Sequence, residues 1–539
     1  MLKSIFAVCA LSGLILIPAR AEERVDLGTI HQIKSEAFQN SKVMDTMFYL
    51  TDANGPRVTN SPGYFAAADW VVKQLKEWGI PARTEKWGPF GRGWTFTRFS
   101  AHLVEPVYAP LIGYPQAWTS STNGSVTGEP MLVEKLTTDE DLGKWKGKLN
   151  GKIVLIGAPV ELKMNMAPQG CRYTDAELAD VAGAPDPGAT FGFRGPARPG
   201  AQPGGQPSGP EAARQFQTRL QQFLSDEHPL VVVRSGQGRS EGGTVFGGSS
   251  GSRELKDPVA PPTIVLTPEH YNRIVRLLDH KIPVKVEVES QTKFFDDRTD
   301  SVNVVGEIEG GSKKDQVVMI GAHLDSWQGG TGATDNAAGS AVMIETMRIL
   351  KTLNLKMDRT VRLALWGGEE EGLLGSKAYV KEHFGDPETM KLGAEHAKLD
   401  GYFNVDNGSG KIRGVYLQGN EMMRPIFESW LAPFHDLGAS TISIRNTGGT
   451  DHLSFDAVGL PGFQFIQEPL EYNSRTHHSN MDVYDRIQAG DLMQMAAIVA
   501  SVVYNTATRD ETLPRKPLPK PQPRRGSDTA RPSGAGAAN

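Results

Sequence analysis

Short apolar runs alternate with longer segments of helical periodicity between residues 296 and 508. Segments 337–353 and 492–504 repeat apolar residues at the spacing of one helix face. Four other runs have the length and composition of buried strands, namely residues 317–321, 361–366, 402–405 and 462–466. This alternation predicts an α/β fold with a mostly parallel mixed sheet flanked by helices.

The pattern before residue 296 has two parts. Residues 22–110 open with helical patterning, in which Val71, Leu75 and Trp78 recur at helical spacing. Residues 111–295 instead contain a helix start at Thr267 and short strand-like runs at 152–156, 229–233, 262–266 and 283–288. We therefore expect one domain made of 22–110 and 296–508, with a smaller β-rich domain, 111–295, inserted between its parts.

Three stretches lack any such pattern. Residues 185–210 and 235–252 are rich in Gly, Pro and Ser, so we expect long mobile loops there. Residues 509–539 are dominated by Pro, Arg and Lys toward their end, which predicts a disordered tail.

The first residues resemble an export signal. Lys3 precedes an apolar run over 4–17, and Ala19-Arg20-Ala21 supplies the small residues of a cleavage site before Glu22. The run is short for a membrane span, which needs ~20 residues. We expect a signal peptide at 1–21 and an exported protein, periplasmic or extracellular, without a stable membrane anchor.

Composition narrows the function further. The net charge of −5 disfavours nucleic acid as a partner, because phosphate binding requires a basic surface. Without the signal, Cys171 is the one cysteine left, so the sequence predicts no intrachain disulfide. No motif surrounds Cys171, and we expect an idle thiol.

Acidic and histidine residues follow the predicted strands. They occur as His323-Leu324-Asp325, Asp335-Asn336, Glu369-Glu370-Glu371, Asp406-Asn407 and His477-His478. The carboxyl ends of strands in an open α/β sheet meet at one edge, so these residues can converge. A charge cluster between a buried strand and an apolar turn is costly unless a cation compensates it. Two imidazoles with three or four carboxylates suit a pair of zinc ions.

Five motifs together carry a family resemblance. They are His323-x-Asp325, Gly332-Ala333-x-Asp335-Asn336, Glu369-Glu370-x-Gly372-Leu373-x-Gly375-Ser376, Asp406 and His478-Ser479-x-x-Asp482. In order and spacing they resemble the di-zinc aminopeptidase/glutamate carboxypeptidase family. Residues 111–295 resemble the protease-associated domain inserted in many members. Gly448-Gly449-Thr450-Asp451 and Gly459-Leu460-Pro461-Gly462 look most like the plasma glutamate carboxypeptidase branch, which acts on dipeptides.

The resemblance implies a zinc exopeptidase fold and a role for each matching residue. Two Zn²⁺ per chain would share Asp335, with His323 and Asp406 on one metal and Glu370 and His478 on the other. Zinc would lower the pKa of the attacking water to about 7 and polarise the scissile carbonyl.

The resemblance also implies the groups that work beside the metals. Glu369 would be the general base, taking a proton from the water and passing it to the leaving amine. Asp325 would hold the second nitrogen of His323. Glu371 fills a variable position of its motif, and we expect it to be solvated.

Several residues near these motifs keep two interpretations. Many family members have Tyr where this chain has His477, so His477 either donates to the oxyanion or is structural, with Tyr472 as a nearby replacement. Asp451 and His452 either line the substrate pocket or belong to a plain loop, and the same holds for Arg445 and Asn446.

These features favour a secreted exopeptidase that acts on dipeptides or short peptides as an aminopeptidase or dipeptidase. A carboxypeptidase on the same fold stays open, because the sequence identifies no arginine for a free carboxylate. A single-zinc glutaminyl cyclase and a non-catalytic receptor-like binding module fit the complete ligand set less well. The expected partner is a peptide substrate, and a homodimer stays open.

Overall fold

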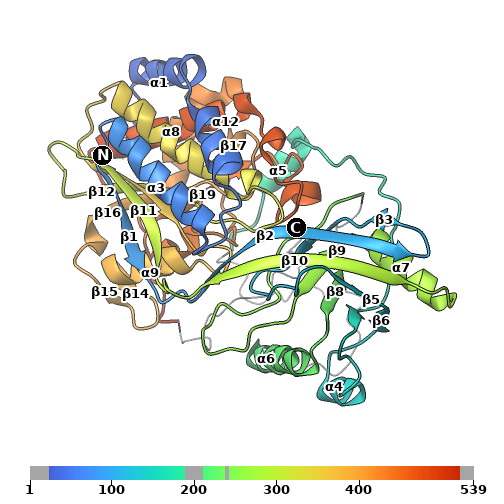
Figure 1. Cartoon of the computed structure of the whole chain (residues 1–539). Coiled ribbons are helices and arrows are strands. Elements are labelled where there is room, and N and C mark those ends of the chain that lie inside the picture. Colours follow the sequence, from blue (N-terminus) through green and yellow to red (C-terminus); the bar gives the residue numbers. More distant parts are fainter. Residues whose placement is uncertain (1–22, 188–209, 237–241, 523–539) are drawn as a thin grey trace, which may run out of the picture.

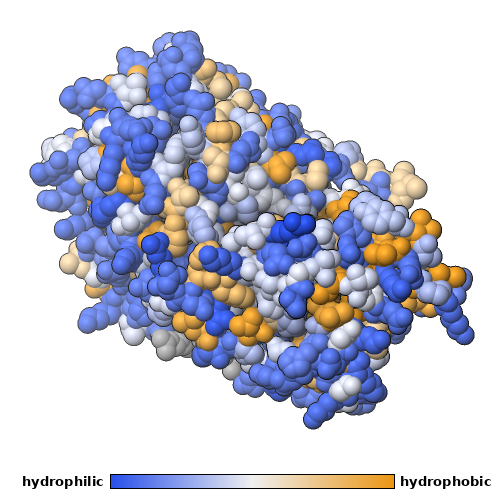
Figure 2. All heavy atoms as spheres, viewed as in Figure 1, coloured by the Kyte–Doolittle hydropathy of each residue, from blue (hydrophilic) through white to orange (hydrophobic). Residues whose placement is uncertain are grey.

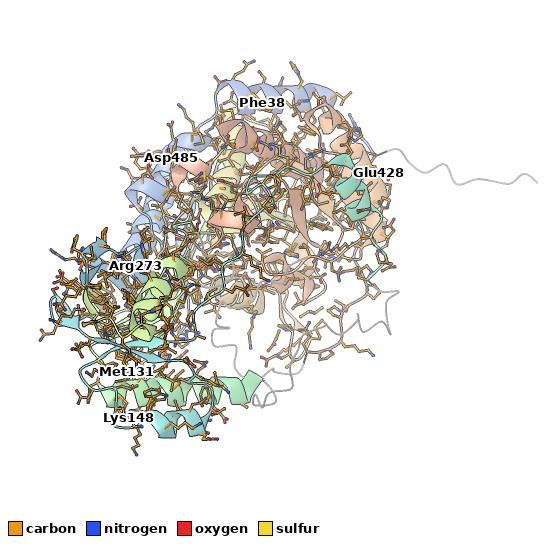
Figure 3. All side chains as sticks on the ribbon, turned by 90° about the vertical axis from the view of Figure 1, so that its right-hand side faces the viewer. Phe38, Met131, Lys148, Arg273, Glu428 and Asp485 are labelled. Atoms are coloured by element: carbon orange, nitrogen blue, oxygen red, sulfur yellow. The ribbon has the colours of Figure 1, made fainter. Side chains whose placement is uncertain are left out.

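The computed structural model describes residues 23–187, 210–236 and 242–522. The signal peptide predicted at 1–21 lies outside these residues. Two lobes are visible, and the long strands β2 (Gly93–Glu105) and β10 (Lys285–Phe295) run from one to the other (Figure 1). In the view of Figure 3, Phe38, Glu428 and Asp485 lie in the larger lobe and Met131, Lys148 and Arg273 in the smaller one.

The larger lobe is built on a mixed sheet. In the described part of the chain its order is β1 (Ala82–Trp87), β11 (Ser301–Ile308), β13 (Thr360–Trp366), β12 (Val317–His323), β16 (Leu399–Asn404), β19 (Gly462–Gln467), β17 (Ile412–Tyr416) and β18 (Thr441–Ser443). The central strands β13, β12, β16 and β19 are parallel to one another. Antiparallel pairs flank them, β1 with β11 and β11 with β13 on one side and β17 with β19 on the other. The predicted mixed α/β sheet flanked by helices is confirmed.

Helices cover both faces of this sheet. Val318 and Ile320 of β12 point into one core and Met319 into another, because successive side chains of a strand face opposite sides. The first core packs against α1 (Leu27–Gln39), α2 (Val43–Phe48), α3 (Pro62–Glu77), α8 (Ala338–Thr352), α10 (Arg424–Leu431) and α12 (Ala489–Thr508). The second packs against α9 (Leu374–His383) and α11 (His452–Asp456). After α9, β14 (Gly385–Asp386) and β15 (Lys391–Leu392) form a small ribbon.

The smaller lobe contains two further sheets. One has the order β4 (Gly113–Pro115), β9 (Thr263–Leu266), β8 (Val231–Ser235), β7 (Ile153–Ile156) and β6 (Pro130–Val133), and the other β3 (Ala109–Pro110), β2, β10 and β5 (Val126–Gly128). An apolar core that includes α7 (Pro268–Asp279) joins the two sheets. A second core packs α4 (Asp139–Trp145) and α6 (Pro210–Glu227) on the far side of the five-stranded sheet. From this part of the chain, α5 (Asp175–Ala182) reaches β18 of the larger lobe.

The surface differs between the lobes. On the face drawn in Figure 2, hydrophilic residues dominate the larger lobe, and hydrophobic ones gather toward the smaller lobe. Val107, Tyr108 and Ile112 are among the exposed apolar residues near β3. Among the described helices, none combines the length and the apolar character that crossing a membrane requires.

Two segments that composition marked as mobile or disordered are packed. Leu513 is buried, its N–H donates to Asp400 at 2.6 Å, and Lys516 pairs with Asp456, so residues 509–522 are not a disordered tail. Residues 523–539 lie outside the described part. In the stretch predicted as a mobile loop at 235–252, Val245 is likewise buried against the larger lobe. One apolar anchor and a few main-chain hydrogen bonds suffice for such packing and leave no periodic signal in sequence.

Candidate active site

The predicted ligands lie where the parallel strands end. His323 is the last residue of β12, and Glu369 follows β13. Asp406 follows β16, and Asp335 lies in a short helical turn, η2 (Ala333–Ala337), that leads into α8. The carboxyl ends of neighbouring parallel strands share one edge of the sheet, which brings these distant residues together.

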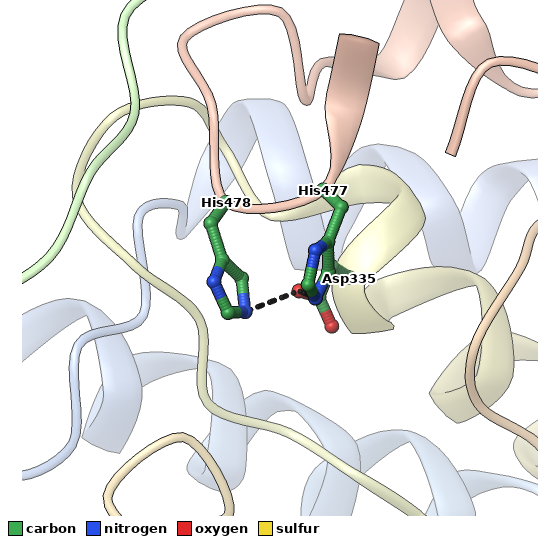
Figure 4. Close-up of side chains that lie close together, drawn as sticks. All are labelled: Asp335, His477 and His478. Atoms are coloured by element: carbon green, nitrogen blue, oxygen red, sulfur yellow. Dashed lines mark ion pairs between the residues drawn. The ribbon is translucent and has the colours of Figure 1, made fainter. Parts of the chain in front are cut away.

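Asp335 lies between two imidazoles. Its Oδ1 is 3.2 Å from His323 Nε2, and its Oδ2 is 3.1 Å from His478 Nε2. Figure 4 shows His478 directed at Asp335 from the same loop that carries His477. One carboxylate thus presents a separate oxygen to each of two histidines, as a ligand shared by two cations must.

Each of these histidines faces a second carboxylate. His323 Nε2 is 3.7 Å from Asp406 Oδ2, and His478 Nε2 is 2.9 Å from Glu370 Oε2. Ligand atoms of His323, Asp335 and Asp406 all lie within 4.8 Å of one another. The structure therefore brings the five predicted ligands together as two groups that share Asp335.

The site has the properties of a cation site. Asp335 Oδ2 and Glu370 Oε1 are buried, yet neither accepts a hydrogen bond of normal geometry from the described residues. The surrounding carboxylic acids are Asp325, Asp335, Glu369, Glu370, Glu371, Asp406, Asp451 and Asp482. Gathering so many carboxylates away from water is costly without positive charge, and imidazole with carboxylate is a ligand set that zinc accepts. The residues present thus fit divalent metal ions.

The carboxylates of the site differ in how easily they ionise. Burial opposes the ionisation of Asp335, but the imidazoles of His323 and His478 outweigh it and hold its pKa well below the usual value. Desolvation raises the pKa of Glu370 to about 7 against the attraction of His478, and it raises the pKa of Glu369 well above its usual value. A bound cation would lower the raised pKa values of Glu369 and Glu370 and favour their ionised forms.

Asp325 acts differently from the prediction. The nearest atom to His323 Nδ1 is the main-chain oxygen of Asp325, at 3.0 Å, whereas the carboxylate is 3.7 Å away. The carboxylate instead accepts the N–H groups of Glu369 and Glu370, at 3.3 and 3.2 Å, and the Thr59 hydroxyl at 3.1 Å. Asp325 therefore holds both the histidine and the glutamate turn, through different atoms.

The expectation that Glu371 is solvated is wrong. Glu371 is buried, and its Oε2 lies 2.9 Å from Thr59 Oγ1, the hydroxyl that also faces Asp325. Burial, reinforced by the charge of Asp325, raises the pKa of Glu371 well above its usual value. The position is variable in the motif, but here the turn after β13 directs this side chain inward, toward the loop that carries Thr59.

His477 lies beside the ligands and is more exposed than they are. Its Nε2 is 3.7 Å from Asp335 Oδ2, and its ring stacks on His478 with centroids 3.7 Å apart. The ring of Tyr472 is 4.8 Å from that of His477 and is itself buried. His477 thus lies at the more exposed side of the site.

The Gly-rich segment before β19 contributes one buried acid. Asp451 is fully buried, and neither of its carboxylate oxygens has a hydrogen bond of normal geometry from the described residues. Burial raises its pKa to about 7 against the attraction of His323. His452 is buried against Gln418 Nε2 at 2.8 Å, whereas Arg445 and Asn446 are exposed. Among Arg445, Asn446, Asp451 and His452, Asp451 is the residue whose carboxylic acid lies near the ligands.

Sequence reasoning assigned no role to Asp482. Its carboxylate accepts the N–H of Thr334 at 2.5 Å, the Thr334 hydroxyl at 2.7 Å and the N–H of Asp335 at 3.3 Å. It therefore anchors the turn that presents Asp335. The spacing of His478 and Asp482 was the available signal, but the spacing does not show which turn the carboxylate holds.

A segment of the smaller lobe holds the last ligand loop. Gly247 donates to the main-chain oxygen of His478 at 2.6 Å, and Val245 and Asn480 exchange hydrogen bonds of 2.7 and 3.0 Å. His478 has φ of 60°, a conformation that is unfavourable for a residue with a side chain and needs support from its surroundings. These contacts provide such support, so residues 245–247 contribute to the site that the larger lobe carries.

Comparison with known proteins agrees with this geometry. Residues 303–503 match peptidase family M28. This segment of the chain belongs to peptidase family M28. It is 30% identical over 273 residues to carboxypeptidase Q of Homo sapiens, which covers 50% of this chain and 55% of that protein. It is 29% identical over 223 residues to aminopeptidase YwaD of Bacillus subtilis, covering 41% of this chain and 47% of the relative. The chain spans about half the length of the curated relatives that it matches.

Two solved structures share the fold over most of the length of this chain. A peptidase M28 precursor from Shewanella amazonensis has a TM-score of 0.62 at 24% identity, covering 92% of this chain and 98% of that one. A zinc aminopeptidase from Bacillus subtilis has a TM-score of 0.52 at 18% identity, covering 87% and 96%. At these identities the likeness establishes the fold, and the predicted family is confirmed by the sequence match.

Proposed function

We propose that this M28 protein is a secreted di-zinc exopeptidase that removes a terminal residue from dipeptides or short peptides. The observation that carries the proposal is the position of Asp335, which directs one oxygen to His323 and the other to His478. A site for one metal ion would not need two histidine–carboxylate pairs that share Asp335. This argument favours two zinc ions over the single zinc of a glutaminyl cyclase.

The ligands would be His323 and Asp406 for one zinc, Glu370 and His478 for the other, and Asp335 for both. When bound, zinc supplies Lewis-acid polarisation of the scissile carbonyl and makes water acidic enough to react at neutral pH.

Glu369 is the residue that moves the proton. The Asp325 carboxylate holds the main chain of Glu369 at 3.3 Å, next to the ligand Glu370. A general base in this position can accept the proton of the attacking water and deliver it to the leaving amine. His477, at the more exposed side, is placed to donate a hydrogen bond to the oxyanion that develops on the substrate.

Charge favours recognition of a free amino terminus. Carboxylic acids beyond the five ligands surround the site, among them Glu369 and Asp451, and they can accept hydrogen bonds from a protonated amine. A cavity of about 320 Å³ lies beside Thr334 and Thr476. Its arginines are already paired, Arg172 with Asp491 at 2.8 Å and Arg486 with Glu471 at 3.2 Å. This argues for aminopeptidase or dipeptidase action, although the name of the human relative makes carboxypeptidase action the alternative to test.

The deciding experiment uses one dipeptide in three forms: free, N-blocked and C-amidated. Aminopeptidase action predicts that N-blocking alone abolishes hydrolysis, and strict dipeptidase action predicts that either change does. Loss of hydrolysis on C-amidation alone would show a carboxypeptidase. Metal analysis of the same preparation should give two zinc ions per chain, and one zinc per chain would overturn the two-metal assignment.

Glu369→Gln supplies the matched control, because it keeps the shape of the side chain and removes the base. We expect this variant to retain zinc and to lose turnover by ~10²–10⁴-fold. Turnover near the wild-type rate would remove Glu369 from the mechanism.

A further inference from the structure

Arg57 lies beneath the candidate metal site, outside the segment that matches the family. It belongs to the loop between α2 and α3, and it is fully buried. A buried arginine needs partners for its donors, because an unpaired charged group away from water is costly. The partners of Arg57 therefore reveal what it does.

Those partners are mainly main-chain oxygens at the two ends of the connection between His323 and Asp335. Nε donates to Leu324 O at 2.6 Å, beside His323, and Nη1 donates to Thr331 O at 2.7 Å. Nη2 donates to Gly332 O at 2.9 Å, three residues before Asp335. Nη1 also donates to Leu50 O at 2.5 Å, which ties the guanidinium to its own part of the chain.

The main chain of Arg57 contacts the same segment as its side chain does. Its N–H donates to Ser326 Oγ at 3.1 Å, and its carbonyl accepts the N–H of Ser326 at 3.1 Å. One residue thus holds both ends of the connection between β12 and η2, residues 324–332. The planar fork of a guanidinium can hold several carbonyls in fixed directions, whereas an ammonium cannot reach them together.

The charge of Arg57 also faces the site. Burial lowers its pKa to about 10, partly offset by the carboxylates of Asp482, Asp325 and Asp335, so the group is positively charged at neutral pH. Its hydrogen bonds within the described part of the chain end on carbonyl or hydroxyl oxygens, so the carboxylates are attracted by the charge without being drawn out of position.

We propose that Arg57 is a positioning residue that fixes the connection between His323 and Asp335 at both of its ends and thereby sets the affinity for zinc. This inference rests on the proposed function, since it concerns the same ligands. It predicts that the shape of the guanidinium matters in addition to its charge.

The test is zinc affinity, measured by competition with a chromogenic chelator on the full-length protein. Arg57→Lys keeps the charge and loses the fork, and we expect its zinc affinity to fall ~10–100-fold, the effect typical of residues that orient ligands. Ser326→Ala removes only the hydroxyl acceptor, and we expect a smaller loss of a few-fold. If Arg57→Lys does not fold, the zinc affinity of Ser326→Ala tests the proposal instead.

Arg359→Lys is the matched control. Arg359 is equally buried and donates to Gln316 Oε1 and Thr506 O, at 2.8 and 3.0 Å. It precedes β13, so it lies at the end of the sheet opposite to the site. We expect a lower melting temperature with wild-type zinc affinity for this variant. If Arg57→Lys behaves in the same way, or if folded Arg57→Lys and Ser326→Ala both bind zinc like the wild type, Arg57 is merely structural and the inference fails. If the wild type itself binds no zinc, the proposed function fails instead.

Discussion

Asp325→Asn separates two ways in which this carboxylate can support catalysis. The resemblance to the aminopeptidase/glutamate carboxypeptidase family implies that the side chain orients His323. By contact, it holds the turn of Glu369 and Glu370, since Oδ1 accepts one N–H and Oδ2 accepts the other together with the Thr59 hydroxyl. An asparagine keeps a single acceptor oxygen, so one of these positions must receive an amide NH₂ that cannot accept.

The structure indicates which hydrogen bond is lost. Keeping the oxygen at the Oδ2 position preserves two hydrogen bonds, so the amide should face the N–H of Glu369. Losing a hydrogen bond to a charged group costs ~1.5–3 kcal/mol. If that loss appears as misplacement of the base, it corresponds to a fall in kcat of ~10–100-fold. Glu370 stays held, and zinc affinity should change little.

The assay is steady-state hydrolysis of a dipeptide together with chelator competition for zinc. A kcat within threefold of wild type would contradict the role at the glutamate turn. A large loss of zinc affinity with normal turnover of the zinc-saturated protein would instead favour the role at His323. Asp400→Asn is the control, because Asp400 is also buried, accepts the N–H of Leu513 and pairs with Arg359 at 3.1 Å far from the site. It should lower stability and leave kcat unchanged.

Three further outcomes are expected. His477→Ala should lower kcat by ~10²-fold while zinc is retained, and a change of only a few-fold would show that His477 is structural. In zinc-free protein the pKa of Glu370, Asp451 and Asp482 is raised to about 7, so the folded state binds protons more tightly than the unfolded state. The melting temperature measured in the presence of a chelator should therefore fall from pH 5 to pH 8. Saturating zinc should reverse that trend. A chelator-treated protein whose melting temperature rises with pH would contradict this prediction. Leu513→Ala should destabilise folding by ~2–5 kcal/mol in denaturant titration, whereas an unchanged midpoint would mean that the segment after α12 packs without contributing.

Much of the fold was predictable because its central strands are apolar on both faces. The parallel strands β12, β13, β16 and β19 are covered by helices on each side, and such strands form continuous apolar runs. The long strands β2 and β10 were missed or shortened, because they are half-exposed along much of their length. β17 and β18 are short and were missed for lack of a long enough pattern.

The region between β8 and β9 shows why composition was a poor guide to mobility. Its Gly-rich segment at 242–252 has no helical or strand periodicity, yet Gly247 and Val245 lie against the loop of His478. Gly247 also lies close to the connection after β12, since a Cβ there would lie 3.1 Å from the nitrogen of Gly329. Glycine in such a stretch signals close contact as readily as mobility.

What the sequence by itself determined is the identity and order of the chemical groups: His323, Asp335, Glu369, Glu370, Asp406 and His478 could be named because each follows a strand end that topology sends to one edge. What only the tertiary structure decided is how those groups are held. The contacts of Arg57 with Leu324 and Thr331, of Asp325 with Glu369, and of Gly247 with His478 join residues far apart along the chain. Such contacts are made largely through main-chain atoms, which every residue possesses, so no residue type in the sequence reveals them.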